Sequence, residues 1–258
     1  PYENPELLPA QRKAISHALS HQLTIISGGP GTGKTFTAGH LVRALSSDVK
    51  RLYTVCLTAP TGRAAQHLQS AFRSSDLPIV LRTDTLHRLL KLSPGQSKLF
   101  RSHPIDADVV IVDEASMIDV DLWAHLLKSI QGSTKLIILG DPDQLPPIEA
   151  GSVFADLAEK FAISLDQCMR TDRVELQELS AMIRKGSFEK VFPLLERSFG
   201  LFELPTAESL YHTLSPPVYP TVPDPKTCLE FFQRCKLLSA LRQGPFGVDA
   251  INELSWRL

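Results

Sequence analysis

The sequence has almost no net charge and no apolar run long enough to cross a membrane. Its 258 residues include 27 Lys and Arg against 28 Asp and Glu, a formal net charge of −1. This balance argues against a protein that coats nucleic acid by bulk charge, although it allows a local basic groove. A membrane-spanning helix needs about 20 apolar residues in a row. Because a signal peptide is also absent, we expect a cytoplasmic chain with no membrane partner.

Cysteine pairs with metal-site or redox spacing are also missing. The four cysteines stand at positions 56, 168, 228 and 235 and form no C-x-x-C pair. This spacing argues against zinc ribbons and thioredoxin-like motifs, and reduced thiols are expected. The sequence contains no internal repeat and no low-complexity segment.

What the sequence does contain is a complete P-loop at residues 28–35, which fits G-x-x-x-x-G-K-[ST] at every defined position. An apolar run at residues 23–26 precedes it, and a helix-like stretch at residues 35–45 follows. Backbone N–H groups of such a loop surround phosphate oxygens. Lys34 is expected to reach the β- and γ-phosphates of a nucleoside triphosphate, and the Thr35 hydroxyl to hold Mg²⁺.

Short apolar runs alternate with helix-like segments over the first 160 residues. Strands are expected at residues 23–27, 53–58, 108–113 and 134–140, and the last two have the composition of buried central strands. This alternation predicts an α/β fold with a parallel sheet flanked by helices. After residue 160 we expect a strand at 162–165, helices at 174–184 and 188–197, and a late strand at 236–241.

An acidic pair, Asp113 and Glu114, ends the third expected strand. Beside a P-loop, a carboxylate in this position is the Walker B arrangement. Asp113 is expected to hold Mg²⁺ mostly through water, and Glu114 to orient and deprotonate the attacking water. After the fourth strand, Gln144 stands in a proline-rich loop, where a glutamine beside the γ-phosphate can sense hydrolysis through one hydrogen bond.

Taken in order, five motifs resemble those of superfamily 1 DNA helicases, and within these the RecD family, the alpha subunit of exodeoxyribonuclease V and its stand-alone relatives. The motifs lie at residues 28–35, 59–65, 85–90, 113–117 and 140–148, and residues 238–248 are similar to a further RecD segment. The resemblance implies a P-loop NTPase with a RecA-like motor domain at residues 1–160. Residues 161–258 are then an incomplete second RecA-like domain, because two further motifs of the family would lie beyond Leu258.

The resemblance also assigns nucleotide-site roles. It implies that Gln11 reads the adenine edge and that Arg170 reaches the γ-phosphate from the second domain, with Arg173 as a nearby competitor for that role. Without the family, a solvated Gln11 near a helix start is the simpler interpretation. The nucleotide-binding residues expected are Gln11, Gly28, Gly29, Pro30, Gly31, Thr32, Gly33, Lys34 and Thr35, with Glu114, Lys34, Gln144 and Arg170 catalytic and Thr35 and Asp113 at the metal.

Single-stranded DNA is the implied ligand of the motifs at residues 59–65 and 85–90. The residues that match the DNA-contacting positions of the family are Pro60, Thr61, Arg63, Thr85, His87 and Arg88. Small hydroxyls suit sequence-independent phosphate contact, and the His87 ring is available for stacking. For His87 and Arg88, a structural or solvated role is a substantial alternative. Residues 92–104 fall where relatives carry a strand-splitting hairpin, and a plain linker is an equal alternative there.

The function implied is an ATP-dependent 5′-to-3′ DNA helicase or translocase acting in double-strand-break repair and recombination. ATP and Mg²⁺ are the implied cofactors; single-stranded DNA, duplex ends and other exodeoxyribonuclease V subunits are the implied partners. One alternative is a nucleotide-binding docking subunit that is not a motor. Another is a different DNA-dependent P-loop ATPase, such as an AAA+ loader. Because the expected second domain is incomplete, this chain alone is expected to bind nucleotide and to hydrolyse it poorly or not at all.

Overall fold

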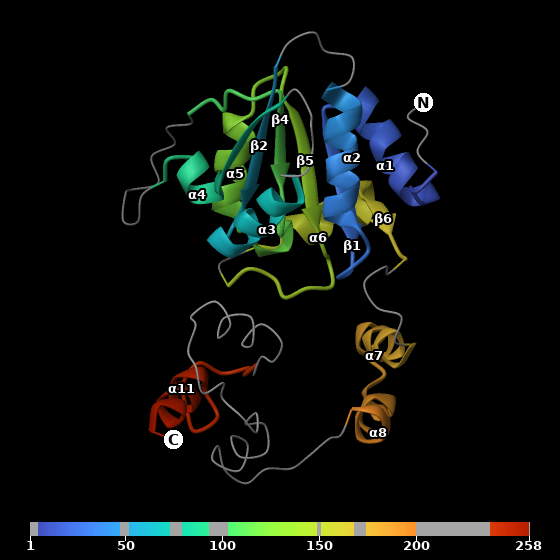
Figure 1. Cartoon of the computed structure of the whole chain (residues 1–258), viewed down its shortest axis with the longest axis vertical. Coiled ribbons are helices and arrows are strands. Elements are labelled where there is room, and N and C mark those ends of the chain that lie inside the picture. Colours follow the sequence, from blue (N-terminus) through green and yellow to red (C-terminus); the bar gives the residue numbers. More distant parts are fainter. Residues whose placement is uncertain are drawn as a thin grey trace, which may run out of the picture. The chain divides into compact units, whose positions relative to one another are not determined.

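The computed structural model describes residues 5–46, 52–72, 79–92, 103–148, 151–167, 174–199 and 238–257. Contacts divide the chain into one unit at residues 1–184 and another at residues 185–258. The first unit holds a sheet covered by helices on both faces (Figure 1). In the described part of the chain, no helix is both long and apolar enough to span a membrane.

The sheet has six strands in the order β3-β2-β4-β5-β1-β6, and every neighbouring pair is parallel. The strands are β1 (Leu23–Gly28), β2 (Tyr53–Ala59), β3 (Ile79–Thr85), β4 (Val109–Val112), β5 (Lys135–Gly140) and β6 (Ile163–Leu165). All four residues of β4 are buried, as expected for a central strand with helices on both sides. The α/β fold with a parallel sheet flanked by helices is therefore confirmed.

Two apolar cores cover the two faces of this sheet. On one face pack α1 (Pro9–Ser20), α2 (Lys34–Ser46) and α3 (Gly62–Phe72). On the other pack α4 (Leu86–Leu89), α5 (Val120–Ser129) and α6 (Val153–Phe161). Successive β4 residues alternate between the cores, since Ile111 belongs to the first and Val110 and Val112 to the second. Because helices cover both faces, the loops at the strand ends are where a ligand site is expected.

The expected strands at residues 23–27, 53–58, 108–113, 134–140 and 162–165 are present with ends that differ by at most one residue. Strand β3 was not expected. It lies at the edge of the sheet, and its residues are intermediate or exposed, so it lacks the continuous apolar run of a central strand. The expected strand at 236–241 is wrong in its described part, because residues 238–241 form no strand and Leu238 is exposed.

Strand β6 lies beyond the expected domain boundary at residue 160, yet it pairs with β1 of the first sheet, with Ile26 opposite Ile163. The observed boundary between compact units comes later, after Arg184. The expected helices 174–184 and 188–197 correspond to α7 (Val174–Arg184) and α8 (Phe188–Ser198), and a further helix, α11 (Val248–Arg257), follows. The incomplete second RecA-like domain stays a prediction.

Candidate nucleotide and nucleic-acid site

Three loops leave the sheet at the same edge, because the carboxyl ends of parallel strands lie together. The P-loop follows β1, Asp113 and Glu114 follow β4, and the loop at residues 140–148 follows β5. Strand β5 lies between the other two and pairs Ser27 with Gly140 and Val112 with Ile138. Ligands of doubly wound sheets bind at this edge. The three motifs are therefore brought together as expected.

Two side chains of the P-loop donate hydrogen bonds to the loop's own backbone. Lys34 Nζ donates hydrogen bonds to the carbonyl oxygens of Gly28 at 2.6 Å and Gly29 at 3.1 Å. The Thr32 hydroxyl donates to the Gly29 carbonyl at 2.9 Å. Gly31 and Gly33 have φ angles of +78° and +84°, which strain any residue with a β-carbon. The motif's glycines and its lysine thus act together to shape the loop.

Asp113 and Glu114 form a largely desolvated acidic pair. Asp113 is 7% exposed, and its Oδ1 accepts the backbone N–H of Glu114 at 2.8 Å. Burial raises the pKa of Asp113, and the hydrogen bond from Glu114 and the charge of Lys34 oppose this rise. Burial, followed by the charge of Asp113, raises the pKa of Glu114. The positive charge of Lys34 thus lowers the pKa of both carboxylates, as expected if the three side chains share one site.

The backbone of Glu114 is strained. Its φ and ψ of 53° and 42° lie in the left-handed region, which residues with a β-carbon rarely adopt. Such strain concentrates at sites where a side chain must be aimed. The strain supports the role expected for Glu114, and neither motif spacing nor composition would have indicated it.

The turn after β5 places Gln144 beside the segment that follows the acidic pair. The carboxylate of buried Asp141 accepts the backbone N–H of Asp143 at 3.1 Å, and the Asp141 carbonyl accepts that of Gln144 at 3.2 Å. The hydroxyl of Ser116, two residues after Glu114, donates to Gln144 Oε1 at 3.5 Å. Sequence reasoning missed Asp141 and Ser116, because neither residue type signals burial at the end of a strand.

Gln11 lies against the P-loop. A β-carbon added to Gly33 would be 2.7 Å from Gln11 Nε2, while Gln11 Oε1 accepts the backbone N–H of Leu8 at 3.0 Å. The side chain is only 3% exposed, so the alternative of a solvated residue at the helix start is wrong. Recognition of adenine by Gln11 stays a prediction.

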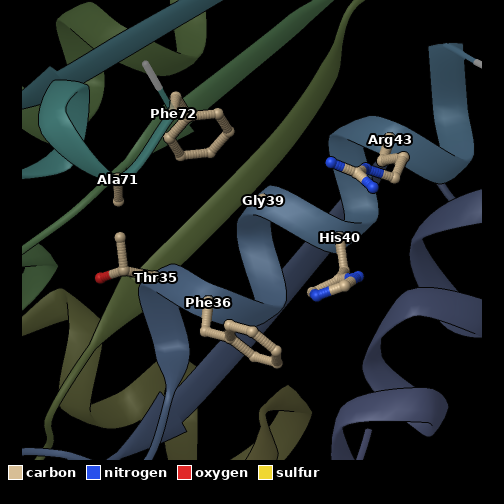
Figure 2. Close-up of a pocket in the computed structure, with 7 residues that line it drawn as sticks. All are labelled: Thr35, Phe36, Gly39, His40, Arg43, Ala71 and Phe72. Atoms are coloured by element: carbon tan, nitrogen blue, oxygen red, sulfur yellow. The ribbon is translucent and has the colours of Figure 1, made fainter. Parts of the chain in front are cut away.

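A groove of about 290 Å³ that the sequence did not indicate runs from Thr35 along α2 and is closed on its other side by Ala71 and Phe72 of α3 (Figure 2). The ring of Phe36 meets that of His40 edge to face, with 4.4 Å between centroids. Burial, and then the charge of Arg43, lower the pKa of His40. Thr35, whose hydroxyl is expected to bind the metal, lines this groove, whereas P-loop residues 28–34 do not.

The residues expected to contact DNA gather at the ends of β2 and β3, where Ala59 pairs with Thr85. Thr61 Oγ1 accepts the Ala64 backbone N–H at 3.3 Å, and Thr85 Oγ1 accepts that of Arg88 at 3.4 Å. Both hydroxyls thus cap helix starts. Thr61, Arg63, His87 and Arg88 are exposed, while Pro60 and Thr85 are half-buried. Arg88 also pairs with Asp84 at 3.8 Å. DNA contact by these residues stays a prediction.

Some predicted positions lie outside the described residues. These are Arg170 and Arg173, and most of the loop at residues 92–104. Their expected roles stay predictions.

Comparison with known families gives one match that spans most of the chain. A family described as an AAA domain matches residues 6–200. The chain belongs to this AAA domain family. Membership agrees with the P-loop and the acidic pair at the carboxyl edge of the sheet.

Relatives of this AAA domain chain include RecD proteins, which confirms the resemblance found in the ordered motifs. It is 34% identical to the RecBCD enzyme subunit RecD of Mycolicibacterium smegmatis, over 94% of this chain and 49% of the relative. It is also 34% identical to the ATP-dependent RecD2 DNA helicase of Deinococcus radiodurans, over 62% of this chain and 21% of the relative. The chain spans about half the length of these curated relatives, or less.

Solved structures support the fold alone. The Pif1 helicase of Candida albicans superposes with a TM-score of 0.50 at 21% identity, over 69% of this chain and 44% of that one. A structure of two coordinating Pif1 helicases at forked double-stranded DNA gives a TM-score of 0.50 at 18% identity, over 69% and 48% of the two chains.

Proposed function

We propose that this chain is the nucleotide-binding motor part of an ATP-driven, RecD-type DNA helicase that moves 5′ to 3′ on single-stranded DNA. The observation that carries this proposal is the meeting of the P-loop, the Asp113–Glu114 pair and Gln144 at one edge of the sheet. The similarity to RecD proteins supports the choice of a DNA motor among P-loop ATPases. A role in double-strand-break repair and recombination is part of the same proposal.

ATP and Mg²⁺ are the proposed cofactors, and the residues present fit both. The P-loop offers backbone N–H groups and the Lys34 ammonium to phosphates. Buried Asp113 and the Thr35 hydroxyl are hard oxygen donors, the type that Mg²⁺ prefers. When bound, Mg²⁺ neutralises charge that develops on the transferring phosphate.

The residues of the chain divide the chemistry among them. Lys34 holds phosphate oxygens, and Glu114 accepts a proton from the attacking water. The raised pKa of Glu114 makes it a stronger base than an ordinary carboxylate. Gln144 gains or loses a hydrogen bond as the phosphate leaves, and its bond to Ser116 connects it to the segment that follows Glu114. Arg170 completes the charge stabilisation when the cleft closes.

The chain is proposed to move along DNA as part of a protein complex. Residues 60–63 and 85–88 offer exposed hydroxyl, imidazole and guanidinium groups for phosphate contact and stacking at the ends of β2 and β3. Single-stranded DNA, duplex ends and other exodeoxyribonuclease V subunits are the proposed partners, in the cytoplasm.

ATP hydrolysis with and without single-stranded DNA tests this function, with Lys34→Ala as the blank. We expect nucleotide binding that Lys34→Ala weakens by roughly 10- to 100-fold, the usual value of a charge-assisted bond. Lys160→Ala, an exposed lysine on α6, is the matched control and should bind as the wild type does.

The outcomes separate the candidate functions. Turnover that DNA stimulates and Lys34→Ala abolishes supports the motor. Binding without DNA-stimulated turnover favours the docking subunit or a motor that needs further residues. Turnover that requires oligomerisation favours a loader of AAA+ type. A wild-type chain that binds no nucleotide overturns the proposal.

A further inference from the structure

Arg184, the last residue of α7, reaches the backbone of the P-loop. The position that a β-carbon on Gly29 would take is filled by the Arg184 guanidinium, whose Cζ is 3.1 Å from that position. Both residues belong to the same compact unit. Because Gly29 has no side chain, the Arg184 guanidinium can lie against the loop that is expected to hold phosphates.

Asp143 holds this guanidinium from the turn after β5. Arg184 Nε lies 3.3 Å from Asp143 Oδ2, and the two side chains are 41% and 55% exposed. Ion pairs exposed to this degree contribute little to stability, so this one exchanges partners easily. The Asp143 backbone is meanwhile fixed by its hydrogen bond to buried Asp141.

Phosphate competes with a carboxylate for a guanidinium, because the planar N–H fork binds both anions in the same bidentate manner. A triphosphate carries more negative charge than the single Asp143 carboxylate. We propose that Arg184 binds a phosphate of the nucleotide and that Asp143 competes with that phosphate for it. This inference rests on the nucleotide-binding role of the P-loop proposed above.

The exchange has a direct route to the catalytic carboxylate. Asp143 precedes Gln144, whose Oε1 accepts a hydrogen bond from Ser116, close to Glu114 in the chain. One turn therefore contacts both the α7 arginine and the segment that carries the general base. Transfer of Arg184 from Asp143 to phosphate alters the charge at this turn when nucleotide binds.

Calorimetric titration of the 258-residue chain with a non-hydrolysable ATP analogue and with ADP tests the proposal. Arg184→Ala should weaken the analogue about tenfold, the effect of one bond to a charged group. Arg184→Lys should fall in between, because it keeps the charge and loses the fork. Lys185→Ala, which removes the neighbouring positive charge, is the matched control and should leave the affinity unchanged.

Asp143→Asn supplies the second, independent arm. It removes the competing charge, so the analogue should bind roughly threefold more tightly, and this gain should vanish in the Arg184→Ala background because the two residues are coupled. Unchanged affinity in Arg184→Ala, or a gain from Asp143→Asn that persists without Arg184, overturns the inference. If either of these results is found, but the wild type binds nucleotide and Lys34→Ala weakens that binding, the proposed function stands without this inference. A wild type that binds no nucleotide overturns both.

Discussion

The two ends of one sheet edge differ in how they hold their functional residues. After β1, β4 and β5, Asp113 and Asp141 are buried, Glu114 is half-buried with a strained backbone, and Gln144 is exposed. After β2 and β3, exposed or half-buried residues such as Thr61 and Thr85 cap short helices and face solvent. The fold is the same at both ends, but the chemistry expected of them is not.

This difference reflects the ligand proposed for each end. Nucleotide is proposed for the end formed by the loops after β1, β4 and β5, here called the nucleotide end. DNA is proposed for the end formed by residues 60–63 and 85–88 after β2 and β3, here called the DNA end. Phosphate and metal need fixed donors at fixed positions, and a desolvated site strengthens their interactions. A DNA strand held without sequence preference needs only accessible donors along a path. Substitutions at the first end should therefore affect folding and nucleotide together, whereas those at the second should affect DNA binding alone.

The largest effect on stability is expected from Gly140→Ala at the nucleotide end. A β-carbon there would lie 2.6 to 3.0 Å from three atoms of the buried Phe154 ring, which has no space to move into. Overpacking of this kind costs about 1–3 kcal/mol of unfolding free energy, measurable by urea denaturation.

Gly62→Ala at the DNA end is the matched control. Its nearest neighbour would be the Thr85 methyl at 3.9 Å, an ordinary contact, so alanine in α3 should be neutral or stabilise by up to ~1 kcal/mol. Equal losses from both substitutions would remove the distinction between the ends.

Asp113→Asn should stabilise the protein while removing a carboxylate proposed to bind Mg²⁺. Burial raises the pKa of Asp113 in the folded state, so its ionised form lowers stability as the pH rises through that pKa. Asparagine still accepts the Glu114 N–H and carries no charge to desolvate, so we expect a gain in stability at pH 7.

The pH dependence makes this prediction specific. The gain from Asp113→Asn should shrink as the pH falls below the raised pKa, because the wild-type carboxyl then becomes protonated and neutral. Thermal unfolding between pH 4 and 8 measures it. Asp84→Asn, on a half-buried residue that caps the Thr85 N–H, should change stability by less than about 0.5 kcal/mol. Destabilisation by Asp113→Asn at pH 7 would contradict the argument.

Thr61→Ala should give the smallest effect, confined to the DNA end. Loss of the hydroxyl removes one phosphate donor and one cap, and single-strand affinity should fall roughly fivefold, equivalent to about 1 kcal/mol. Fluorescence anisotropy with labelled single strands measures this. Thr61→Ser retains the hydroxyl and should restore the affinity, and nucleotide affinity should not change in either variant. A parallel loss of nucleotide binding would show that the two ends are not separate.

Sequence reasoning succeeded where chemistry demands rare residue combinations. The P-loop, the acidic pair and the apolar strands on either side of them were all placed within a residue or two. It failed where a segment is defined by its neighbours. Edge strand β3 lacks a continuous apolar run and was not expected. Strand β6 was expected as a strand, but its place in the first sheet follows only from its pairing with β1.

The sequence alone determined the fold class and predicted the nucleotide chemistry proposed here, because glycines, a lysine and strand-end carboxylates at fixed spacing have few other uses. Only the tertiary structure decided which side chains meet. The burial of Gln11 against Gly33, the bond between Ser116 and Gln144, and the approach of Arg184 to Gly29 join residues far apart in the chain. Such contacts follow from strand order and helix packing, which local patterns do not encode.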